Sequence, residues 1–342
     1  DSITAYEDGG ALVFSANDLL GNDTDPNPND VLTVVSVGES QMGATVTLIN
    51  GEITYDIGDR FQSLAAGQTL SDSFAYEIRD SKGATATSVV NVSIVGTNDA
   101  PVVTADTAQV IEDLQWFTSG NVLANDSDVD VGSVLKVASP GYYFGQYGLL
   151  ALAENGSYAY ALNNFSYAVQ SLGRDSTVTE RFSFNVTDGA LNTASTLDIR
   201  VSGRNDAPTL VCALSDQYAP INRSFSWQVP KGSFVDIDKG DTLDFKATLA
   251  DGSPLPAWLN FDAATSTFSG VSPKRVERFL DIRVTATDRV AATGSTDESL
   301  SSSDIFRVSF SHGNQGLGNG QDAPPPGHST NWNDGPGTYP GS

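Results

Sequence analysis

One ten-residue turn occurs twice in this chain of 342 residues in almost the same form. IVGTNDAPVV occupies Ile94–Val103, and VSGRNDAPTL occupies Val201–Leu210, 107 residues further on. A Glu-Asp pair recurs over nearly the same distance, from Glu7 to Glu112. Turns usually vary more than the elements that they connect, so this recurrence marks a period. The period is a whole domain of about 100 residues, the usual size of a β-sandwich module.

A third copy is weaker but readable. FVDIDKGDTLDF begins at Phe234, where the earlier copies have LGNDTDPNPNDVLTV and LANDSDVDVGSVLKV, and DIRVTATDRVAATG begins at Asp281. Three tandem modules follow, and a final stretch rich in Gly and Pro predicts a disordered tail or a linker. The predicted bounds are 1–100 for the first module, 101–207 for the second, 208–312 for the third, and 313–342 for the tail.

Each copy consists of short runs of β-branched and aromatic residues bounded by turn residues. In the first copy these runs are VLTVVSV, ATVTLI, EITYDI, SFAYEI and TSVVNVSIV. Asn50-Gly51, Asn155-Gly156 and Asp251-Gly252 are hairpin signals, and no sustained helical period accompanies them. The predicted fold class is all-β, with three tandem Greek-key β-sandwich domains and a flexible C-terminal tail.

Charge and composition exclude several classes of partner. The formal net charge is -24 at pH 7, which argues against nucleic acid and anionic membrane surfaces and favours hard cations. The single cysteine, Cys212, allows no internal disulfide, and we expect it to be buried at the start of a strand. No apolar run is long enough for membrane insertion, and the opening Asp1 suggests a piece of a longer exported polypeptide.

The chemistry lies in acidic loops that carry carboxylates at alternate positions. They contain Asp23, Asp25 and Asp30 in the first copy, Asp126, Asp128 and Asp130 in the second, and Asp236, Asp238 and Asp241 in the third. Residues i and i+2 of an extended chain project to one side, so two such oxygens can converge on one ion. Aspartate also caps turns without any metal, but recurrence at one position of three copies favours Ca²⁺. Zinc does not fit, because His312 and His328 lie far from these loops.

Longer motifs resemble known families. IEDLQWFTSGNVLANDSDVD, FGQYGLLALAENGSYAYALNN and FSFNVTDG make the second module resemble a VCBS repeat. YEDGGALVFSANDLLGNDTDPNPNDVLTVVSVG makes the first resemble bacterial cadherin-like modules. VDIDKGDTLDFKATLADGSPLPAWLNFDAATSTFSGV in the third is similar to the dystroglycan-type cadherin-like family, an immunoglobulin-like module. The resemblance implies immunoglobulin/cadherin-like sandwiches in a large RTX-type bacterial surface adhesin, extracellular at the cell surface or secreted.

The resemblance also implies Ca²⁺ at the junctions between modules. Each site would combine a Glu near the module base, a carboxylate of a later loop, the linker, and the DxD of the next module. The first junction would gather Glu7, Asp80, Asn98, Asp99, Asp126 and Asp128. The second would gather Glu112, Asp188, Asn205, Asp206, Asp236 and Asp238. The remaining predicted ligands are Asp23, Asp25, Asp130, Asp241 and Asp288.

The predicted function is a Ca²⁺-rigidified spacer and cell adhesion segment. Its expected partners are calcium ions, neighbouring modules of the parent chain, and a cell-surface or matrix polysaccharide or protein. An alternative is a Ca²⁺-dependent carbohydrate- or peptide-binding, lectin-like module, in which Trp258 or the aromatic group of Tyr142, Tyr143, Phe144 and Tyr147 would stack on a ligand. Exposure of Trp116 and of the tyrosine group as a coplanar platform favours this alternative, and positions in the core oppose it. A second alternative is a set of accessory domains in a secreted polysaccharide-active enzyme. Catalysis by this chain is not expected, because it has no GxSxG motif and no Cys-His pair.

Overall fold

The computed structural model describes residues 1–289 and 299–311, and these form two compact units. The first unit comprises Asp1–Asp206, Asp236–Thr242 and Arg289–Leu300; the second comprises Ala207–Val235, Leu243–Asp288 and the chain from Ser301 on. The first unit holds two hydrophobic cores and the second unit holds one. The predicted all-β class of tandem sandwiches is confirmed. The exact module bounds stay a prediction, and the tail at 313–342, His312 and His328 lie outside the described residues.

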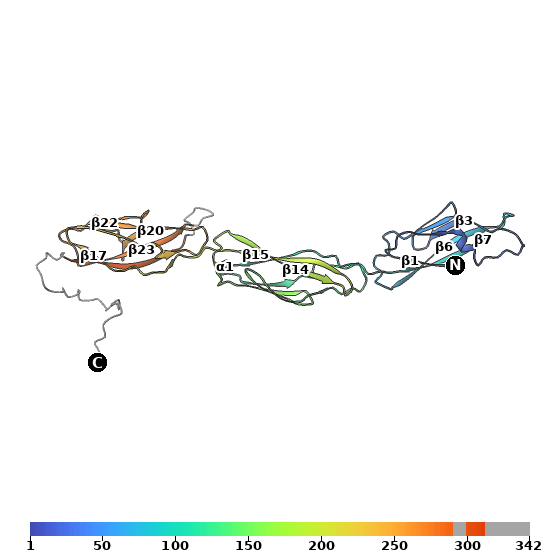
Figure 1. The fold of residues 1–342 in the computed structure, drawn as a ribbon, viewed down its shortest axis with the longest axis horizontal. Coiled ribbons are helices and arrows are strands. Elements are labelled where there is room, and N and C mark those ends of the chain that lie inside the picture. Colours follow the sequence, from blue (N-terminus) through green and yellow to red (C-terminus); the bar gives the residue numbers. More distant parts are fainter. Residues whose placement is uncertain (290–298, 312–342) are drawn as a thin grey trace, which may run out of the picture. The chain divides into compact units, whose positions relative to one another are not determined.

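Two sheets pack against each other in the first module (Figure 1). The strands are β1 (Ser2–Tyr6), β2 (Leu12–Ser15), β3 (Thr33–Ser40), β4 (Thr45–Ile49), β5 (Glu52–Asp56), β6 (Thr69–Arg79) and β7 (Thr85–Val95), with a 3-10 helix, η1 (Ala16–Leu20), after β2. One sheet has the order β1-β7-β6-β3 and the other β2-β5-β4. Only β1 pairs in parallel, along β7, so the chain enters the module at one end and leaves it at the other.

The second module repeats this plan with one more strand. Its strands are β8 (Asp106–Ile111), β9 (Phe117–Asn121), β10 (Lys136–Val137), β11 (Gly141–Phe144), β12 (Gly148–Leu152), β13 (Ser157–Leu162), β14 (Thr177–Thr187) and β15 (Asn192–Ser202), with a single-turn helix, α1 (Tyr167–Gln170). The sheets have the orders β10-β14-β15-β8 and β11-β12-β13-β9. The entering strand β8 again pairs in parallel with the last strand, β15.

The third module has its core in the second unit. Its strands are β16 (Thr209–Leu210), β17 (Gln217–Pro220), β18 (Ser224–Gln228), β19 (Phe234–Val235), β20 (Thr242–Leu249), β21 (Leu259–Asp262), β22 (Thr267–Val271), β23 (Phe279–Arg289) and β24 (Ser301–Ser311). They form sheets of order β17-β24-β23-β20 and β18-β22-β21 and the short pair β16-β19.

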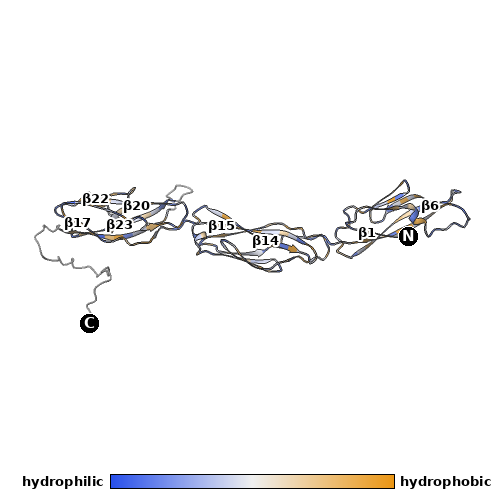
Figure 2. Ribbon diagram, in the orientation of Figure 1, coloured by the Kyte–Doolittle hydropathy of each residue, from blue (hydrophilic) through white to orange (hydrophobic). Residues whose placement is uncertain are grey.

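Alternation of apolar and polar residues decides which face of each strand is buried. In β14, Glu180, Phe182, Phe184 and Val186 are buried, and the residues between them are exposed. Period-two alternation of this kind is expected of a sheet with one wet face. Figure 2 shows the resulting apolar stretches along the strands. No helix among the described residues is long and apolar enough to cross a membrane.

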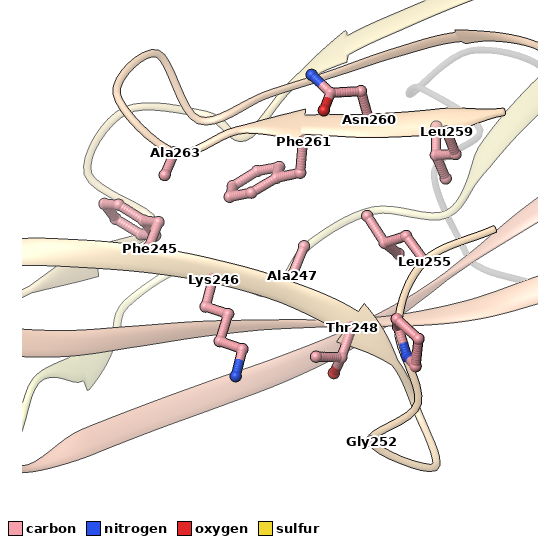
Figure 3. A pocket seen from close by; sticks show the side chains of 11 residues that line it. Phe245, Lys246, Ala247, Thr248, Gly252, Leu255, Leu259, Asn260, Phe261 and Ala263 are labelled. Atoms are coloured by element: carbon pink, nitrogen blue, oxygen red, sulfur yellow. The ribbon is translucent and has the colours of Figure 1, made fainter. Parts of the chain in front are cut away.

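The aromatic residues of the third module belong to its core, as the simpler reading of the sequence predicts. Trp258 and Phe261 pack against the buried cluster around Phe268. Figure 3 shows Phe261 facing Phe245 across a hollow between β21 and β20, and the residues that line this hollow include no carboxylate, histidine or cysteine. The expected burial of Cys212 is wrong: it is exposed, because it lies just beyond the two-residue strand β16.

A buried carboxylate crosses between the two sheets of the first module. Asp72 on β6 accepts hydrogen bonds from the hydroxyl groups of Ser40 and Tyr55 and, at 2.9 Å, from the backbone N–H of Met42. Burial alone would raise the pKa of Asp72, but these donors outweigh burial and lower it. The ionised carboxylate is therefore the stable form inside the core.

The buried pair of Asp72 and Tyr55 has a counterpart in the second module but not in the third. Glu180 accepts from the Tyr160 hydroxyl at 2.8 Å and from the Tyr147 N–H at 3.0 Å. By strand register the matching positions of the third module are Leu280 and Gly270, so this module has neither the carboxylate nor the tyrosine. The third module thus differs from the others in its core as well as in its motifs.

The N–H of Ser73 is a fourth donor to Asp72, at 2.7 Å. We predict that Asp72→Asn destabilises the first module by about 2 kcal/mol, because the amide cannot accept from all four donors of the charged carboxylate. Differential scanning calorimetry of the whole chain should show the transition of the first module moving down while that of the third stays. Glu77→Gln, on the same strand, is the matched control and should change little.

The lowered pKa of Asp72 also predicts that the stability of the first module depends on pH. A carboxyl whose folded pKa is lowered stabilises the protein above its unfolded pKa, and this stabilisation is lost as the pH falls through the folded pKa. The free energies of unfolding of wild type and Asp72→Asn should therefore begin to converge near pH 4 and become similar below the lowered folded pKa of Asp72. A constant difference between them down to acid pH would contradict this account.

Candidate metal centres

The two repeated turns are the linkers that follow β7 and β15, and each begins with a glycine that has no room for a side chain. A Cβ on Gly96 would lie 2.2 Å from the carbonyl oxygen of Leu64. A Cβ on Gly203 would lie 1.9 Å from the carbonyl oxygen of Leu172. The approach of a neighbouring loop to the linker explains why glycine stands at both positions.

A buried glutamate then fixes the start of each linker. Glu7, at the end of β1, accepts from the N–H of Thr97 at 3.1 Å. Glu112, at the end of β8, accepts from the N–H of Arg204 at 3.0 Å and is 0% exposed. Because β1 and β8 run parallel to the last strand of their modules, both glutamates lie at the end from which the linker departs.

The first linker is held at its other side by the acidic loop of the second module. The N–H of Asp99 donates to Oδ2 of Asp130 at 3.0 Å, and the N–H of Asp130 donates to Oδ1 of Asp128 at 2.9 Å. The side-chain amide of Asn98 donates to Oδ2 of Asp188 at 2.7 Å. Four predicted ligands and the linker asparagine therefore come together.

Several carboxylate oxygens in this first cluster are buried without a hydrogen-bond donor. They are Oδ2 of Asp99, Oδ2 of Asp128 and Oδ1 of Asp130. The pKa of Asp99 is raised, first by burial and then by the charges of Asp8, Asp130 and Asp128. Buried polar atoms in proteins nearly always have a partner, so these oxygens are suited to hold a positively charged group.

The second linker repeats the geometry within the first unit. The N–H of Asp206 donates to Oδ2 of Asp238 at 2.7 Å, and the N–H of Asp238 donates to Oδ1 of Asp236 at 2.9 Å. Oxygens of Asp236, Asp238 and Asp241 all lie within 4.8 Å of one another. Oδ2 of Asp206 and Oδ1 of Asp238 are buried without a donor.

Burial disfavours the charged forms in this second cluster. It raises the pKa of Glu112 to about 8, and the charges of Asp206, Asp113 and Asp238 add to the effect, which the N–H of Arg204 opposes. It raises the pKa of Asp238 to about 7, with further contributions from Asp206, Asp236 and Asp241. The site holds more negative charge than its surroundings can stabilise.

A backbone contact flanks each cluster on its far side. The N–H of Val131 donates to the carbonyl of Ser63 at 3.1 Å, and the N–H of Lys239 donates to the carbonyl of Ser171 at 3.1 Å. Each donor directly follows the last aspartate of its DxD pair. Both acidic loops are thus seated on the neighbouring loop that also covers the linker glycine.

The assignment of Asp80 to the first linker and of Asp188 to the second is wrong. Asp80 lies in the hairpin before β7, whereas the linker follows β7, so the 11 residues of that strand, about 36 Å, separate them. Asp188 occupies the equivalent hairpin of the second module and contacts Asn98 of the preceding linker. Each hairpin aspartate belongs to the N-terminal end of its own module.

Asp80 instead forms a third acidic group with two predicted ligands of the first module. Oxygens of Asp25, Asp30 and Asp80 lie within 4.8 Å of one another, and all three side chains are half-buried. Asp80 caps its own turn by accepting from the N–H groups of Lys82 and Ala84, both at 2.8 Å. The matching turn at Asp188 accepts from Ala190 and Leu191.

In the first and second acidic loops, the first carboxylate lies outside the group that the later carboxylates form. Asp126 accepts a hydrogen bond from the N–H of Thr104 at 2.8 Å. Burial raises the pKa of Asp106 to about 6, and the charge of Asp126 adds to this rise. Asp23 lies near the Tyr76 hydroxyl, at 3.4 Å. Asp126 is therefore not brought to the first linker as predicted, because it binds the backbone of Thr104 and lies beside Asp106 instead.

Two acidic residues escaped the sequence prediction. Asp8 and Asp113 each follow the clamping glutamate, and their charges raise the pKa values of Asp99 and Asp206 respectively. Their signal was present in the repeated Glu-Asp pair. Asn205 precedes Asp206 in the second linker, and Asp288 is buried on β23 in the second unit.

Comparison with known proteins agrees with this organisation. A family model described as "Bacterial cadherin-like domain" matches residues 1–96 and 98–203, and one described as "Putative Ig domain" matches residues 207–303. No curated protein matches the chain. The more specific resemblance of the second module to VCBS repeats stays a prediction.

Solved structures share the fold at low sequence identity. Mouse cadherin-23 domains EC22–24 are 14% identical with a TM-score of 0.55, over 91% of this chain and 95% of that one. Protocadherin gamma B2 domains 1–5 are 17% identical with a TM-score of 0.54, over 94% of this chain and 59% of that one. The chain therefore spans little more than half of that protocadherin structure. Because the cadherin-like family model matches more than half of its residues, the chain belongs to the bacterial cadherin-like domain family.

Proposed function

We propose that both linkers are Ca²⁺ sites and that the chain is a Ca²⁺-rigidified spacer and cell adhesion segment of an extracellular bacterial adhesin. The observation that carries this proposal is the set of buried carboxylate oxygens at each linker that have no donor. Cadherin-like domains generally bind Ca²⁺ between domains, and they are typically extracellular and adhesion-related. An RTX-type or VCBS-containing parent protein is part of the same proposal.

The donor set fits Ca²⁺ better than a transition metal. The linker clusters offer carboxylate, amide and backbone oxygens, and they contain no cysteine or histidine. Ca²⁺ takes six to eight oxygen ligands in loose geometry, whereas zinc prefers nitrogen and sulfur. Extracellular modules of this kind bind Ca²⁺ with dissociation constants on the order of 10⁻⁴ to 10⁻³ M.

The residues would couple two modules through one short segment. Asp99 and Asp206 belong to the linkers, Glu7 and Glu112 to the preceding strands, and the DxD pairs to the following loops. Without a cation these like charges repel at short distance, which favours opening of the linker. A bound Ca²⁺ supplies the positive charge that lets all of them remain ionised and close together. Each module has its own core, so calcium would stiffen the string without being needed to fold its parts.

We expect isothermal titration calorimetry to detect Ca²⁺ binding that Asp130→Asn and Asp238→Asn each reduce by one linker site. Each substitution removes charge from a side chain that is 4% exposed and has an oxygen without a donor. Asp262→Asn is the matched control, because Asp262 caps an exposed turn in the third module. Equal loss in all three variants would contradict the assignment.

We expect small-angle scattering to show a larger maximum dimension and a narrower distance distribution in millimolar Ca²⁺ than in EDTA. The physical reason is that neutralised linker carboxylates no longer drive hinge opening. Asp130→Asn should lose part of the change, and Asp262→Asn should keep it. Identical profiles with and without Ca²⁺ would refute linker stiffening even if calcium binds.

We expect stability in EDTA to fall as the pH rises from about 5 to about 8, because Asp238 and Glu112 have raised folded pKa values of about 7 and about 8. A carboxyl with a raised folded pKa holds its proton in the native state, so deprotonation through that pKa costs stability. Thermal unfolding measured across this range should show the decline, and saturating Ca²⁺ should abolish it. Glu112→Gln should flatten the decline in EDTA; an unchanged slope would contradict this origin.

A further inference from the structure

The outer face of one sheet in the second module is apolar and exposed. Leu150 of β12 and Tyr160 of β13 point into the core, so their neighbours along each strand point outward. Strand register places the outward residues in two rows across the order β11-β12-β13-β9. One row is Phe144, Leu149, Ala161 and Phe117; the next is Tyr142, Ala151, Ala159 and Ser119.

These two rows form a face with aromatic rings at its edges, which we call the aromatic face. Phe144 and Tyr142 lie on the edge strand β11, with 86% and 73% of their surfaces exposed. Phe117 lies on the opposite edge strand, β9, with 57% exposed. Between them the floor is made mainly of alanine, which leaves the facing sides of the rings open. Trp116, directly before Phe117, is 54% exposed and packs edge-on against Phe165.

The face has no charge in a strongly acidic protein. None of the residues in β9, β11, β12 and β13, all of which are described, is Asp, Glu, Lys, Arg or His. The chain as a whole carries -24. An acidic ligand would be repelled by that net charge, and a basic ligand would find no carboxylate on these strands. The face therefore suits a neutral partner.

The corresponding sheets of the other modules lack these features. In the first module, the outward residues of β5 include Glu52, Thr54 and Asp56. In the third, Ser226 of β18 and Ser269 of β22 pair across the outward face. Both faces are mainly polar, although Val13, Ile49 and Val271 are exposed on them, and they carry no outward aromatic ring on these strands. The aromatic face is specific to the second module and does not follow from the shared fold.

The size of the face argues against a second copy of the chain as its occupant. The face is three strand spacings of ~4.8 Å wide and five residues of ~3.3 Å long, so its area is about 240 Å². A stable protein–protein interface buries about 800 Å² on each partner. A face of this area, with aromatic rings at its edges and small side chains between them, fits a few units of a linear polymer.

We propose that the outer face of β11-β12-β13-β9 binds a neutral polysaccharide. A pyranose ring presents a face of C–H groups that packs against an aromatic ring, while its hydroxyl groups remain at the rim. The Tyr142 and Ser119 hydroxyl groups lie in the same row at the two edges of the sheet and supply polar contacts there. This activity goes beyond the proposed linker function, since the aromatic face contains none of the linker carboxylates.

Affinity electrophoresis of the whole chain tests this proposal. Native gels would contain dextran, xyloglucan or mixed-linkage β-glucan as neutral probes, and alginate as the acidic contrast. We expect at least one neutral probe to retard the chain and alginate not to. The double substitution Tyr142→Ala/Phe144→Ala should weaken retardation about tenfold, because two stacking rings are lost.

Tyr218→Ala is the matched control, since Tyr218 is also an exposed ring and lies on β17 of the third module. It should be retarded as strongly as wild type. Retardation should also persist in EDTA, which separates this proposal from failure or success of the calcium sites. The proposal would be overturned if only alginate, or none of the probes, retarded the chain. It would also be overturned if Tyr218→Ala weakened retardation as much as Tyr142→Ala/Phe144→Ala does. A wild-type dimer in sedimentation velocity that Tyr142→Ala/Phe144→Ala dissociates would assign the face to a second copy and also overturn it.

Discussion

The structure of both linkers depends on carboxylates that accept hydrogen bonds from the linker backbone. Glu7 and Asp130 bind N–H groups only two residues apart, at Thr97 and Asp99. Glu112 and Asp238 bind Arg204 and Asp206 in the same way. A linker clamped from both sides by negative groups is well ordered only if their repulsion is compensated. The acidic excess of the chain therefore has a structural role at these two points.

The fold was largely predictable from local sequence patterns. Hairpin signals, β-branched runs and the domain-length period specified sandwiches, because each of these patterns acts over a few residues or over a whole repeat. Exposure of single residues was harder to predict. Cys212 is exposed because the strand that it was expected to continue ends at Leu210, and element ends depend on tertiary pairing. The buried pairs Asp72–Tyr55 and Glu180–Tyr160 also join strands that are distant in sequence.

The candidate sites were predictable in composition but not in grouping. The acidic loops and the linker residues were identified from their recurrence, and most of them do come together. Asp80 and Asp188 were placed one linker too late, because the end of a sandwich at which a hairpin lies is set by strand direction. Asp126 faces Asp106 and not the linker, since turning of the loop selects which alternate residues converge. Asp8 and Asp113 add charge beside the sites, and Asp8 also accepts a hydrogen bond from the Thr97 hydroxyl group of the first linker; the repeated Glu-Asp pair was their only signal in the sequence.

The three modules share a fold but differ in what they present to solvent. The second carries an uncharged aromatic face, whereas the first and third present polar ones. In the third, an apolar side chain stands in place of the buried carboxylate and a glycine in place of the tyrosine. A string of similar sandwiches can thus combine a spacer role, which depends on the linkers, with recognition by the outer face of one module.

The central claim is that the linker carboxylates hold calcium. A crystal structure of the chain grown in millimolar Ca²⁺, with anomalous difference density measured at long wavelength, tests it directly. The account predicts a peak at the first linker bounded by Asp99, Asp128 and Asp130, and a peak at the second bounded by Asp206, Asp236 and Asp238. Full occupancy of these positions by water, with the carboxylates protonated or turned to solvent, would contradict it.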